Sequence, residues 1–322
     1  MGKPVIYIDG KEGTTGLQIY DRLAGRQDIE LLLIDEAKRK DPVERKKLMD
    51  AADLVFLCLP DAAAVEAVEL VGNPNTRIID ASTAHRTAAG WTYGFPELSR
   101  ERREAVRTAK RVANPGCHAT GFISIVYPLV SMGLLPEDAA LSCFSLTGYS
   151  GGGKPMIAKY ESEGKTPAMC SPALYGLLQN HKHLPEMQKI CSLAKTPVFV
   201  PIVDDYYKGM ASTVPLHMDQ LHGVSSLHEV WQRLADYYAQ NPGLVHVEGD
   251  PTDPASGVDS GFKIYSGMWQ GKDTLSILLA GNDQQFTITS LFDNLGKGAS
   301  GAAVQNMNLM LGFNEAEGLN IS

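Results

Sequence analysis

The first 115 residues alternate between short apolar segments and segments with helical spacing, and this alternation constrains the fold most strongly. The segments 31–34 and 54–59 are apolar along nearly their whole length rather than at every second residue. Strands of this kind are buried on both faces, because helices cover both sides of a parallel sheet. The pattern predicts a doubly wound, Rossmann-type α/β domain. Strands are expected at 5–8, 31–34, 54–59, 77–80 and from Val112, with helices at 17–24, 43–51 and 62–71.

The pattern of expected strands and helices changes after Cys117. Residues 141–146, 198–203 and 275–279 look like longer strands with fewer helices between them, and 298–311 reads as a helix rich in Ala, Met and Leu. This predicts a second, mixed α+β domain. A length of 322 residues supports two domains, and 44% hydrophobic residues exclude a disordered chain.

Charge and cysteine content narrow the function classes. A net charge of −8 argues against a general nucleic-acid binder. No apolar run is long enough for a transmembrane helix, and the N-terminus lacks a signal or transit pattern. Five cysteines without zinc-like spacing indicate a reduced, cytoplasmic protein, in which four cysteines pack and one is reactive; they are residues 58, 117, 143, 170 and 191. No metal site is expected.

The spacing Gly10-x-x-Gly13-x-x-Gly16 lies between the first expected strand and the first expected helix. Glycines there let the backbone turn sharply against a pyrophosphate, and the helix N-terminus attracts the anion. The spacing departs from the common G-x-G-x-x-G, so a plain strand–helix turn is the alternative. Asp35, at the end of the second strand, would favour NAD, whereas the basic run 38–40 would favour NADP.

The segment Asn114-Pro115-Gly116-Cys117 precedes an apolar run, 122–130, that reads as a helix. Cys117 therefore lies at or near a helix N-terminus, where the dipole lowers a thiol pKa and favours the nucleophilic thiolate. Asn114 is predicted to hold an orienting amide nearby. A buried packing cysteine is the alternative, and it suits Cys58 better.

A thiolate needs a partner that handles protons. In an extended backbone, His181 and His183 point the same way, and either could be the acid/base. The alternatives are that the segment carrying these two histidines is a surface loop or a metal site. His118 is a third candidate, although adjacent residues rarely aim at each other.

Two further sites could bind anions. The glycine-rich segment 147–154 could do so through backbone N–H groups and Lys154, with Ser150 and Gly151 as neighbours, unless it is only a flexible hairpin. Arg86 follows the fourth strand at the crevice edge of the sheet, and it could equally be a surface arginine.

The chain resembles the N-acetyl-gamma-glutamyl-phosphate reductases, in their shorter type 2 branch. The resemblance is carried by the glycine turn and by four segments that follow it in order: 114–117, 148–154, 181–186 and 293–299. The resemblance covers nearly the whole chain. One departure is His118, where the family often has tyrosine.

This resemblance implies a glyceraldehyde-phosphate-dehydrogenase-like fold, with an NADP-binding domain of residues 1–116 and 293–322 and a catalytic and dimerisation domain of 117–292. It implies NADPH-dependent reduction of N-acetyl-L-glutamyl 5-phosphate to the 5-semialdehyde and phosphate through a thioester on Cys117, in a homodimer or tetramer. Cofactor contacts are expected from Gly10, Gly13, Thr14, Thr15, Gly16, Lys38, Arg39, Ser82, Asn294, Lys297 and Gly298. Substrate contacts are expected from Arg86, Ser150, Gly151 and Lys154.

Three rival functions remain open at this point. A nucleotide-binding regulator without chemistry explains the glycine turn but not the cysteine. A cysteine hydrolase explains the cysteine but not the turn. An aspartate-semialdehyde dehydrogenase shares the chemistry, and the segments 148–154 and 181–186 point away from it.

Overall fold

The computed structural model describes residues 2–253 and 263–322. These residues fall into two compact units. The first unit comprises Met1–Pro96, Arg100–Gly116 and Ala299–Leu319, and the second comprises Glu97–Ser99, Cys117–Gly298 and Asn320–Ser322. The chain thus passes from one unit to the other between Gly116 and Cys117, and it returns between Gly298 and Ala299. Residues 293–298, which the sequence grouped with the nucleotide domain, lie in the second unit.

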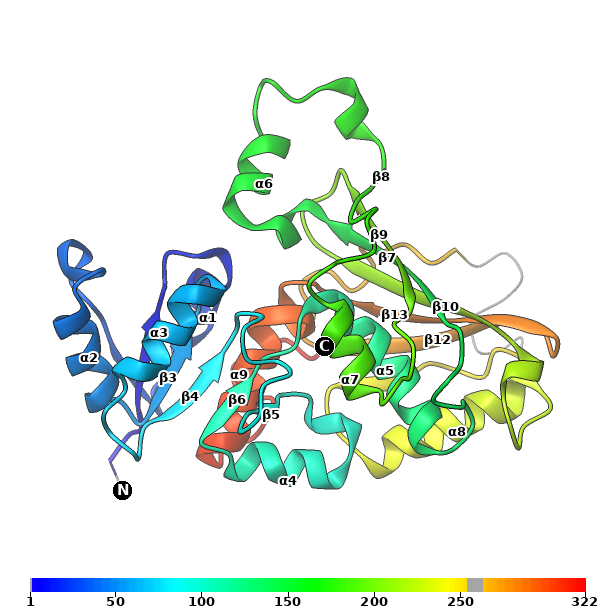
Figure 1. Ribbon diagram of the computed structural model, residues 1–322, viewed down its shortest axis with the longest axis horizontal. Coiled ribbons are helices and arrows are strands. Elements are labelled where there is room, and N and C mark those ends of the chain that lie inside the picture. The colour runs from blue at the N-terminus through cyan, green and yellow to red at the C-terminus, as the bar shows by residue number, and fades with distance from the viewer. Residues whose placement is uncertain (1, 254–262) are drawn as a thin grey trace. The chain divides into compact units, whose positions relative to one another are not determined.

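The first unit contains a six-stranded sheet in the order β2-β1-β3-β4-β6-β5, and its strand pairs are parallel (Figure 1). The strands are β1 (Val5–Asp9), β2 (Glu30–Leu32), β3 (Leu54–Leu57), β4 (Arg77–Asp80), β5 (Thr92–Tyr93) and β6 (Arg111–Ala113). The strand order reverses at β1, because β2 lies on one side of it and β3 on the other. In such sheets ligands bind where the order reverses, beyond the carboxyl ends of the strands.

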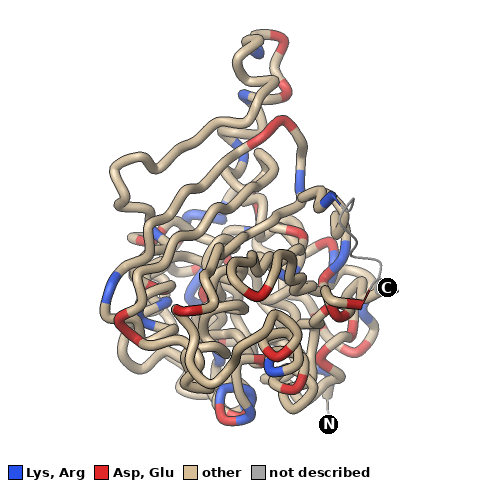
Figure 2. The backbone as a smooth tube through the Cα atoms, turned by 90° about the vertical axis from the view of Figure 1, so that its right-hand side faces the viewer, with Lys and Arg blue, Asp and Glu red and all other residues tan. Residues whose placement is uncertain are grey.

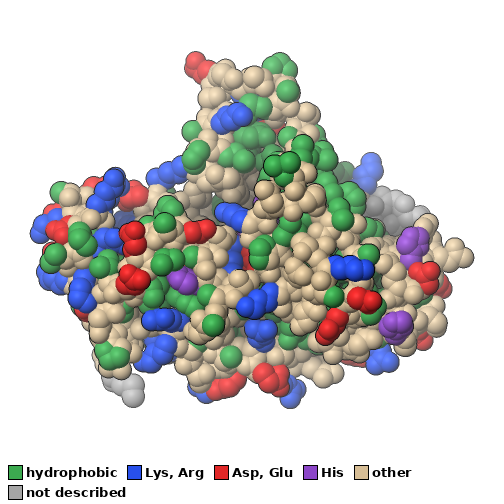
Figure 3. All heavy atoms as spheres, in the orientation of Figure 1, with side chains coloured by type: hydrophobic (Ala, Val, Ile, Leu, Met, Phe, Trp, Pro, Cys, Tyr) green, Lys and Arg blue, Asp and Glu red, His purple; other side chains and the backbone are tan. Residues whose placement is uncertain are grey.

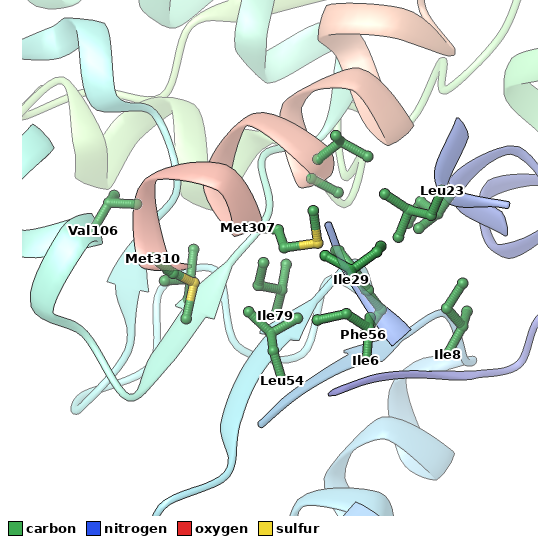
Figure 4. Close-up of a cluster of buried hydrophobic side chains, with 14 residues drawn as sticks. Ile6, Ile8, Leu23, Ile29, Leu54, Phe56, Ile79, Val106, Met307 and Met310 are labelled. Carbon is green, nitrogen blue, oxygen red and sulfur yellow. The ribbon is translucent and has the colours of Figure 1, made fainter. Parts of the chain in front are cut away.

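Helices cover both faces of this sheet. They are α1 (Thr14–Leu23), α2 (Pro42–Ala51), α3 (Asp61–Leu70), α4 (Arg100–Thr108) and α9 (Gly301–Leu311). On one face Leu54, Phe56 and Ile79 pack with Met307 and Met310 of α9 (Figure 4). The other cluster joins the alternate strand residues, such as Val55, to α2 and α3. The predicted doubly wound domain is confirmed.

The second unit has a mixed seven-stranded sheet in the order β11-β12-β13-β10-β7-β9-β8. Its strands are β7 (Ser142–Gly148), β8 (Ala173–Leu174), β9 (Val198–Asp204), β10 (Met210–His217), β11 (Val245–Val247), β12 (Leu275–Gly281) and β13 (Gln285–Phe292). The helices α5 (Cys117–Ser131) and α8 (Leu227–Gln240) pack against it, and α7 (Leu184–Ile190) packs on α5. The predicted mixed α+β domain is confirmed.

Between β7 and β8 the chain leaves this sheet and forms an excursion of three short helical segments. These are η3 (Tyr149–Gly152), α6 (Gly153–Tyr160) and η4 (Pro167–Cys170). Figure 1 shows α6 and the residues after it standing away from the sheet of their own unit. Among the described residues, no helix is both long and apolar enough to cross a membrane.

Candidate active site

Cys117 is the first residue of α5, so the predicted position at a helix N-terminus is confirmed. Partial positive charge from unpaired N–H groups at a helix start favours a thiolate there. Gly298 packs directly against this residue, since a Cβ placed on Gly298 would lie 3.0 Å from Cys117 Cβ. A side chain at position 298 would therefore crowd the base of the thiol.

The other cysteines differ from Cys117 in their surroundings. Burial raises the pKa of the Cys143 thiol to about 12, and Cys191 is also buried. Burial raises the pKa of Cys58 as well, with a smaller contribution from the charges of Asp80 and Asp9. Cys170 is exposed, so the prediction that it packs in the interior is wrong.

His118 is the centre of a buried hydrogen-bond chain. Its Nδ1 lies 2.7 Å from Ser145 Oγ, and its Nε2 lies 2.6 Å from the Tyr175 hydroxyl. Ser145 Oγ also lies 2.7 Å from Ser212 Oγ. Burial lowers the pKa of His118 to about 3, with smaller contributions from His181 and Lys182. His118 is therefore neutral at pH 7, and its two ring nitrogens link Ser145 to Tyr175.

Tyr175 could not be selected as a site residue from the sequence. Burial raises the pKa of its hydroxyl, and the negative charge of Cys117 raises it further, which indicates that the hydroxyl lies near the thiol. Tyr175 follows the two-residue strand β8, and no motif marks it. Only the fold brings it to His118.

His181 and His183 converge on His118, with ring centroids 5.5 and 5.6 Å from the His118 ring and 4.8 Å from each other. The backbone is not extended, because His183 has helical φ and ψ as the residue before α7. The His183 backbone N–H donates to His181 Nδ1 over 3.2 Å. In its neutral form the His181 ring then carries its proton on Nε2. Among the described residues, no group of three or more His, Cys, Asp or Glu is arranged to hold a metal ion.

The Asn114 side chain bonds two groups of the first unit. Its Nδ2 donates to the carbonyl of Ala299 over 3.0 Å, and its Oδ1 accepts from Asn306 Nδ2 over 3.2 Å. Both ends of the amide thus tie the end of β6 to α9 and the segment before it, within the first unit. The predicted orienting role of Asn114 stays a prediction.

Ser82 and Arg86 follow β4 in the first unit. Ser82 Oγ donates to Asp80 over 2.7 Å, and His85 Nδ1 lies 2.6 Å from the same buried carboxylate. Arg86 Nε donates to the carbonyl of Asn114 over 3.1 Å. These contacts shape the loop after β4, and the predicted ligand roles of Ser82 and Arg86 stay predictions.

Asn294 and Lys297 are structural residues of the second unit. Asn294 Nδ2 donates to Ser150 Oγ over 3.0 Å, and its Oδ1 accepts from Gly209 N over 2.8 Å. Lys297 is 1% exposed, and its ammonium donates to Glu97 over 2.8 Å. A buried ammonium paired in this way is committed to the protein. The predicted cofactor contact of Lys297 stays a prediction, and the ammonium already bonds the buried Glu97.

The glycine-rich segment 148–154 is not a hairpin, because it forms η3 and the start of α6. Ser150 is buried against Asn294, whereas Gly151 and Lys154 are exposed. The N–H groups of Tyr149 and Ser150 donate to Tyr206 and Tyr207. Within this segment, the residues that could bind an anion are therefore those from Gly151 onward.

A pocket of 670 Å³ lies at the carboxyl ends of β1, β2 and β3, where the strand order of the first unit reverses. Gly10 lines this pocket with a φ of +84°, and a Cβ on it would lie 2.4 Å from the Cys58 carbonyl oxygen. A Cβ on Gly16 would lie 2.4 Å from the Gly10 carbonyl oxygen. The glycine turn thus packs so closely that larger residues do not fit. Gly13 precedes α1, and Thr14 and Thr15 begin it.

Arg39 and Lys40 line the pocket, together with Arg45, which is paired with Asp9 over 2.6 Å. Lys38, predicted to bind the cofactor, is not among the lining residues and lies 3.9 Å from Glu44. The Asp35 carboxylate accepts from Ala37 N over 3.0 Å as the cap of a short helix, Glu36–Lys38. The positively charged residues that line the pocket are therefore Lys11, Arg39, Lys40 and Arg45, and Lys38 is not among them.

Comparison with known proteins now places the chain in a class. Residues 8–106 match the sequence model of the semialdehyde dehydrogenase NAD-binding domain, and 117–294 match that of the semialdehyde dehydrogenase dimerisation domain. The structure resembles aspartate semialdehyde dehydrogenase II from Vibrio cholerae, with a TM-score of 0.70 at 15% identity over 97% of this chain and 99% of that one. The chain is a member of the semialdehyde dehydrogenase family.

Curated relatives narrow the class. N-acetyl-gamma-glutamyl-phosphate reductase 2 from Nostoc is 45% identical over 99% of this chain and all of its own length. The protein of the same name from Pseudomonas putida is 44% identical over 99% of this chain and all of its own length. Within the semialdehyde dehydrogenases, the chain belongs to the N-acetyl-gamma-glutamyl-phosphate reductases.

The buried state of His118 predicts a pH dependence of stability. Its pKa is about 3 in the native state and about 6.5 in an unfolded chain. Between these values only the unfolded state binds the proton, so the free energy of unfolding falls as the pH drops below about 6.5, by up to about 1.4 kcal/mol per pH unit from this group. Urea unfolding of the wild type and of His118→Gln from pH 8 to pH 4 measures this. The variant is expected to show the shallower slope below pH 6.5 and the same slope above pH 7, and equal slopes throughout would contradict the assignment.

Proposed function

We propose that this chain catalyses the NADPH-dependent reduction of N-acetyl-L-glutamyl 5-phosphate to N-acetyl-L-glutamate 5-semialdehyde and phosphate, a step of arginine biosynthesis. The observation that carries the proposal is Cys117 at the start of α5, beside Tyr175 and the histidine cluster. Curated relatives of 43–46% identity, named for this reductase, support the choice of substrate.

The Cys117 thiolate attacks the acyl carbonyl of the substrate, and the C–O bond to phosphate breaks. The products of this step are a thioester on Cys117 and free phosphate. Forming a covalent intermediate divides one difficult reaction into two easier ones. NADPH, when bound, supplies the hydride that converts the thioester to a thiohemiacetal. Loss of the thiol from that adduct releases the aldehyde and restores Cys117.

His181 is our choice for the acid that protonates the oxygen of the adduct. Its Nδ1 accepts from the His183 backbone N–H, which orients the ring and leaves Nε2 as the nitrogen that we assign to the adduct oxygen. The imidazolium form of the ring delivers the proton. His181 is partly exposed, whereas His183 is 5% exposed and begins the approach to α7. We assign His183 a positioning role. His118 and Ser145 hold the Tyr175 hydroxyl in place near the thiol.

The pocket at the reversal point of the first sheet fits a dinucleotide. Gly10 and Gly16 leave room only for backbone, which allows close approach of a pyrophosphate to the N-terminus of α1. Arg39 and Lys40 line the same pocket and suit the 2′-phosphate that distinguishes NADP from NAD. Gly13, Thr14 and Thr15 would offer the N–H groups of the first turn.

The substrate anions have separate candidate partners. Gly151 and Lys154 are exposed on the segment that follows β7, and we assign them to the phosphate group. Arg86 remains our candidate for the substrate carboxylate, in addition to its bonds with backbone carbonyls.

We also propose that the chain acts as a homo-oligomer in the cytoplasm. The match of 117–294 to a dimerisation domain supports assembly of identical chains. All five cysteines are free, and a reducing compartment maintains a catalytic thiol.

Replacing Cys117 by serine tests the covalent step. Cys117→Ser is expected to lower kcat by about 10⁴-fold or more, because the hydroxyl is a far weaker nucleophile. Phosphate-dependent reduction of NADP by the semialdehyde measures the loss. NADPH binding, followed by its fluorescence, should be unchanged, since the pocket is lined by residues of the first unit. The exposed Cys170→Ser is the matched control and should keep full activity. Retained turnover in Cys117→Ser would exclude the thioester.

The two histidines are distinguished by single substitutions. His181→Asn is expected to lower kcat by about 10²–10⁴-fold and to remove one limb of the pH–rate profile. His183→Asn should lower kcat less and keep both limbs, because its role is to hold His181. Lys182→Ala, between them and exposed, is the control. Equal and mild losses in both histidine variants would show that neither is the acid.

Cofactor preference tests the roles that we propose for Arg39 and Lys40. Arg39→Ala and Lys40→Ala are each expected to raise KM for NADPH by about 5- to 50-fold, since each removes a charge-assisted contact to phosphate. KM for NADH should change little. Lys47→Ala, an exposed lysine paired with Glu44, is the control. An equal loss with NADH and NADPH would place the 2′-phosphate elsewhere.

A further inference from the structure

A buried carboxylate, Asp80, organises the loop that follows β4. Its side chain is 0% exposed, and groups of the loop bond both of its oxygens. Ser82 N donates to Oδ1 over 2.9 Å, Ser82 Oγ donates to Oδ2 over 2.7 Å, and His85 Nδ1 lies 2.6 Å from Oδ2. The Asp80 carbonyl also accepts from Asn114 N over 2.8 Å, which joins the end of β4 to the end of β6. The chain therefore folds back onto this carboxylate as soon as β4 ends.

The same loop is held from two further directions. The His85 ring stacks on Trp91, with ring centroids 4.1 Å apart and an angle of 15° between the ring planes. The Asp61 carboxylate, at the start of α3, accepts from Thr83 N over 2.8 Å. An ionised carboxylate only accepts hydrogen bonds, so His85 donates to Asp80 through Nδ1. The His85 ring thus has a fixed plane and a fixed partner, and the backbone next to it leaves the loop in a set direction.

Arg86 follows His85 directly and reaches the end of β6. Its Nε donates to the Asn114 carbonyl over 3.1 Å, and its Nη2 donates to the Ala81 carbonyl over 3.4 Å. Asn114 lies three residues before Cys117 in the chain. The donors of a guanidinium form a rigid planar fork that matches a carboxylate, so recognition depends on how that plane is oriented. The loop that Asp80 organises sets this orientation.

Positive and negative side chains are mixed over the surface of the chain. The net charge is −8, and Figure 2 shows Lys and Arg interleaved with Asp and Glu along the described backbone. Figure 3 shows side chains of both signs mixed on the face that it draws. Exposed charges farther apart than about 10 Å are largely screened at 0.1 M salt. An anionic substrate therefore gains little from the field of the whole chain, and its recognition depends on individual cations that are correctly oriented.

We propose that Asp80 and His85 are positioning residues that fix the Arg86 guanidinium for the α-carboxylate of the substrate. Asp80 holds the loop through both of its oxygens, and His85 joins that carboxylate to the Trp91 ring. Neither residue touches the substrate, and both act through Arg86. The inference rests on the proposed function, in which Arg86 binds this carboxylate.

Two aldehydes that differ only in the α-carboxylate test the proposal, in the phosphate-dependent reduction of NADP. They are N-acetyl-L-glutamate 5-semialdehyde and 4-acetamidobutanal, which lacks that group. The measured quantity is the ratio of kcat/KM for the semialdehyde to kcat/KM for 4-acetamidobutanal. Arg86→Gln is expected to lower this ratio by about 10- to 100-fold, because a hydrogen bond between charged groups is lost. His85→Phe keeps a ring against Trp91 but loses the bond to Asp80, and it should lower the ratio by about 5- to 20-fold.

Further variants show whether His85 acts through Arg86. His85→Asn offers an amide N–H to Asp80 and should restore most of the ratio. In the Arg86→Gln background, His85→Phe should lower the ratio no further, because two residues that act as a unit are not additive. His222→Phe, the same substitution at an exposed histidine of the second unit, is the matched control. Circular dichroism verifies folding, and Asp80→Asn, which keeps the shape of the side chain, replaces His85→Phe in the comparison if that variant does not fold.

The outcomes separate this inference from the proposed function. An unchanged ratio in folded His85→Phe would overturn the positioning role, and so would a further loss in the double variant. An equal loss with both aldehydes would overturn it as well, since the loop would then serve the chemical step or the cofactor. A wild type that is active but has no preference between the aldehydes would show that Arg86 does not bind the carboxylate. A wild type that oxidises neither aldehyde would contradict the proposed function, and this inference with it.

Discussion

The turn at Pro115 and Gly116 ends β6 and begins α5 at Cys117, and the candidate active site depends on that helix start. The thiol gains the favourable end of the helix dipole because no residue of α5 precedes it. The next residue, His118, projects from α5 in a different direction, and its ring nitrogens bond Ser145 on β7 and Tyr175 after β8. One helix start therefore sets the directions of both the nucleophile and the group that positions its neighbours.

Features that follow from local chain geometry could be predicted from the sequence. The two-domain architecture followed from apolar strands and helical periodicity. The positions of Gly10 and Gly16 were predictable because their packing against Cys58 and Gly10 is a property of a strand–turn–helix unit. The helix start at Cys117 was predictable for the same reason, since Pro115 and Gly116 are adjacent to it.

Features that depend on distant partners could not be predicted in this way. Lys297 looked like a cofactor ligand, but its ammonium meets a buried carboxylate 200 residues earlier in the chain, at Glu97. Asn114 and Asn294 looked like functional amides, and each instead joins backbone or side-chain groups from other elements. Buried polar side chains must find partners, and those partners are set by topology. For Tyr175 the situation is reversed. No motif marks this residue, but the fold places it in the candidate site.

The hydrogen-bond chain through His118 explains how a site rich in titratable groups can stay ordered. A protonated His118 would place a positive charge in a buried site, and burial prevents this by holding His118 neutral at pH 7. A neutral imidazole both donates and accepts, so it can link one hydroxyl on each side, as it does with Ser145 and Tyr175. Ser212 extends the chain from β7 to β10. The proton-transfer role that we propose for His181 is consistent with its greater exposure, and in this proposal the environment rather than the residue type separates the histidines by function.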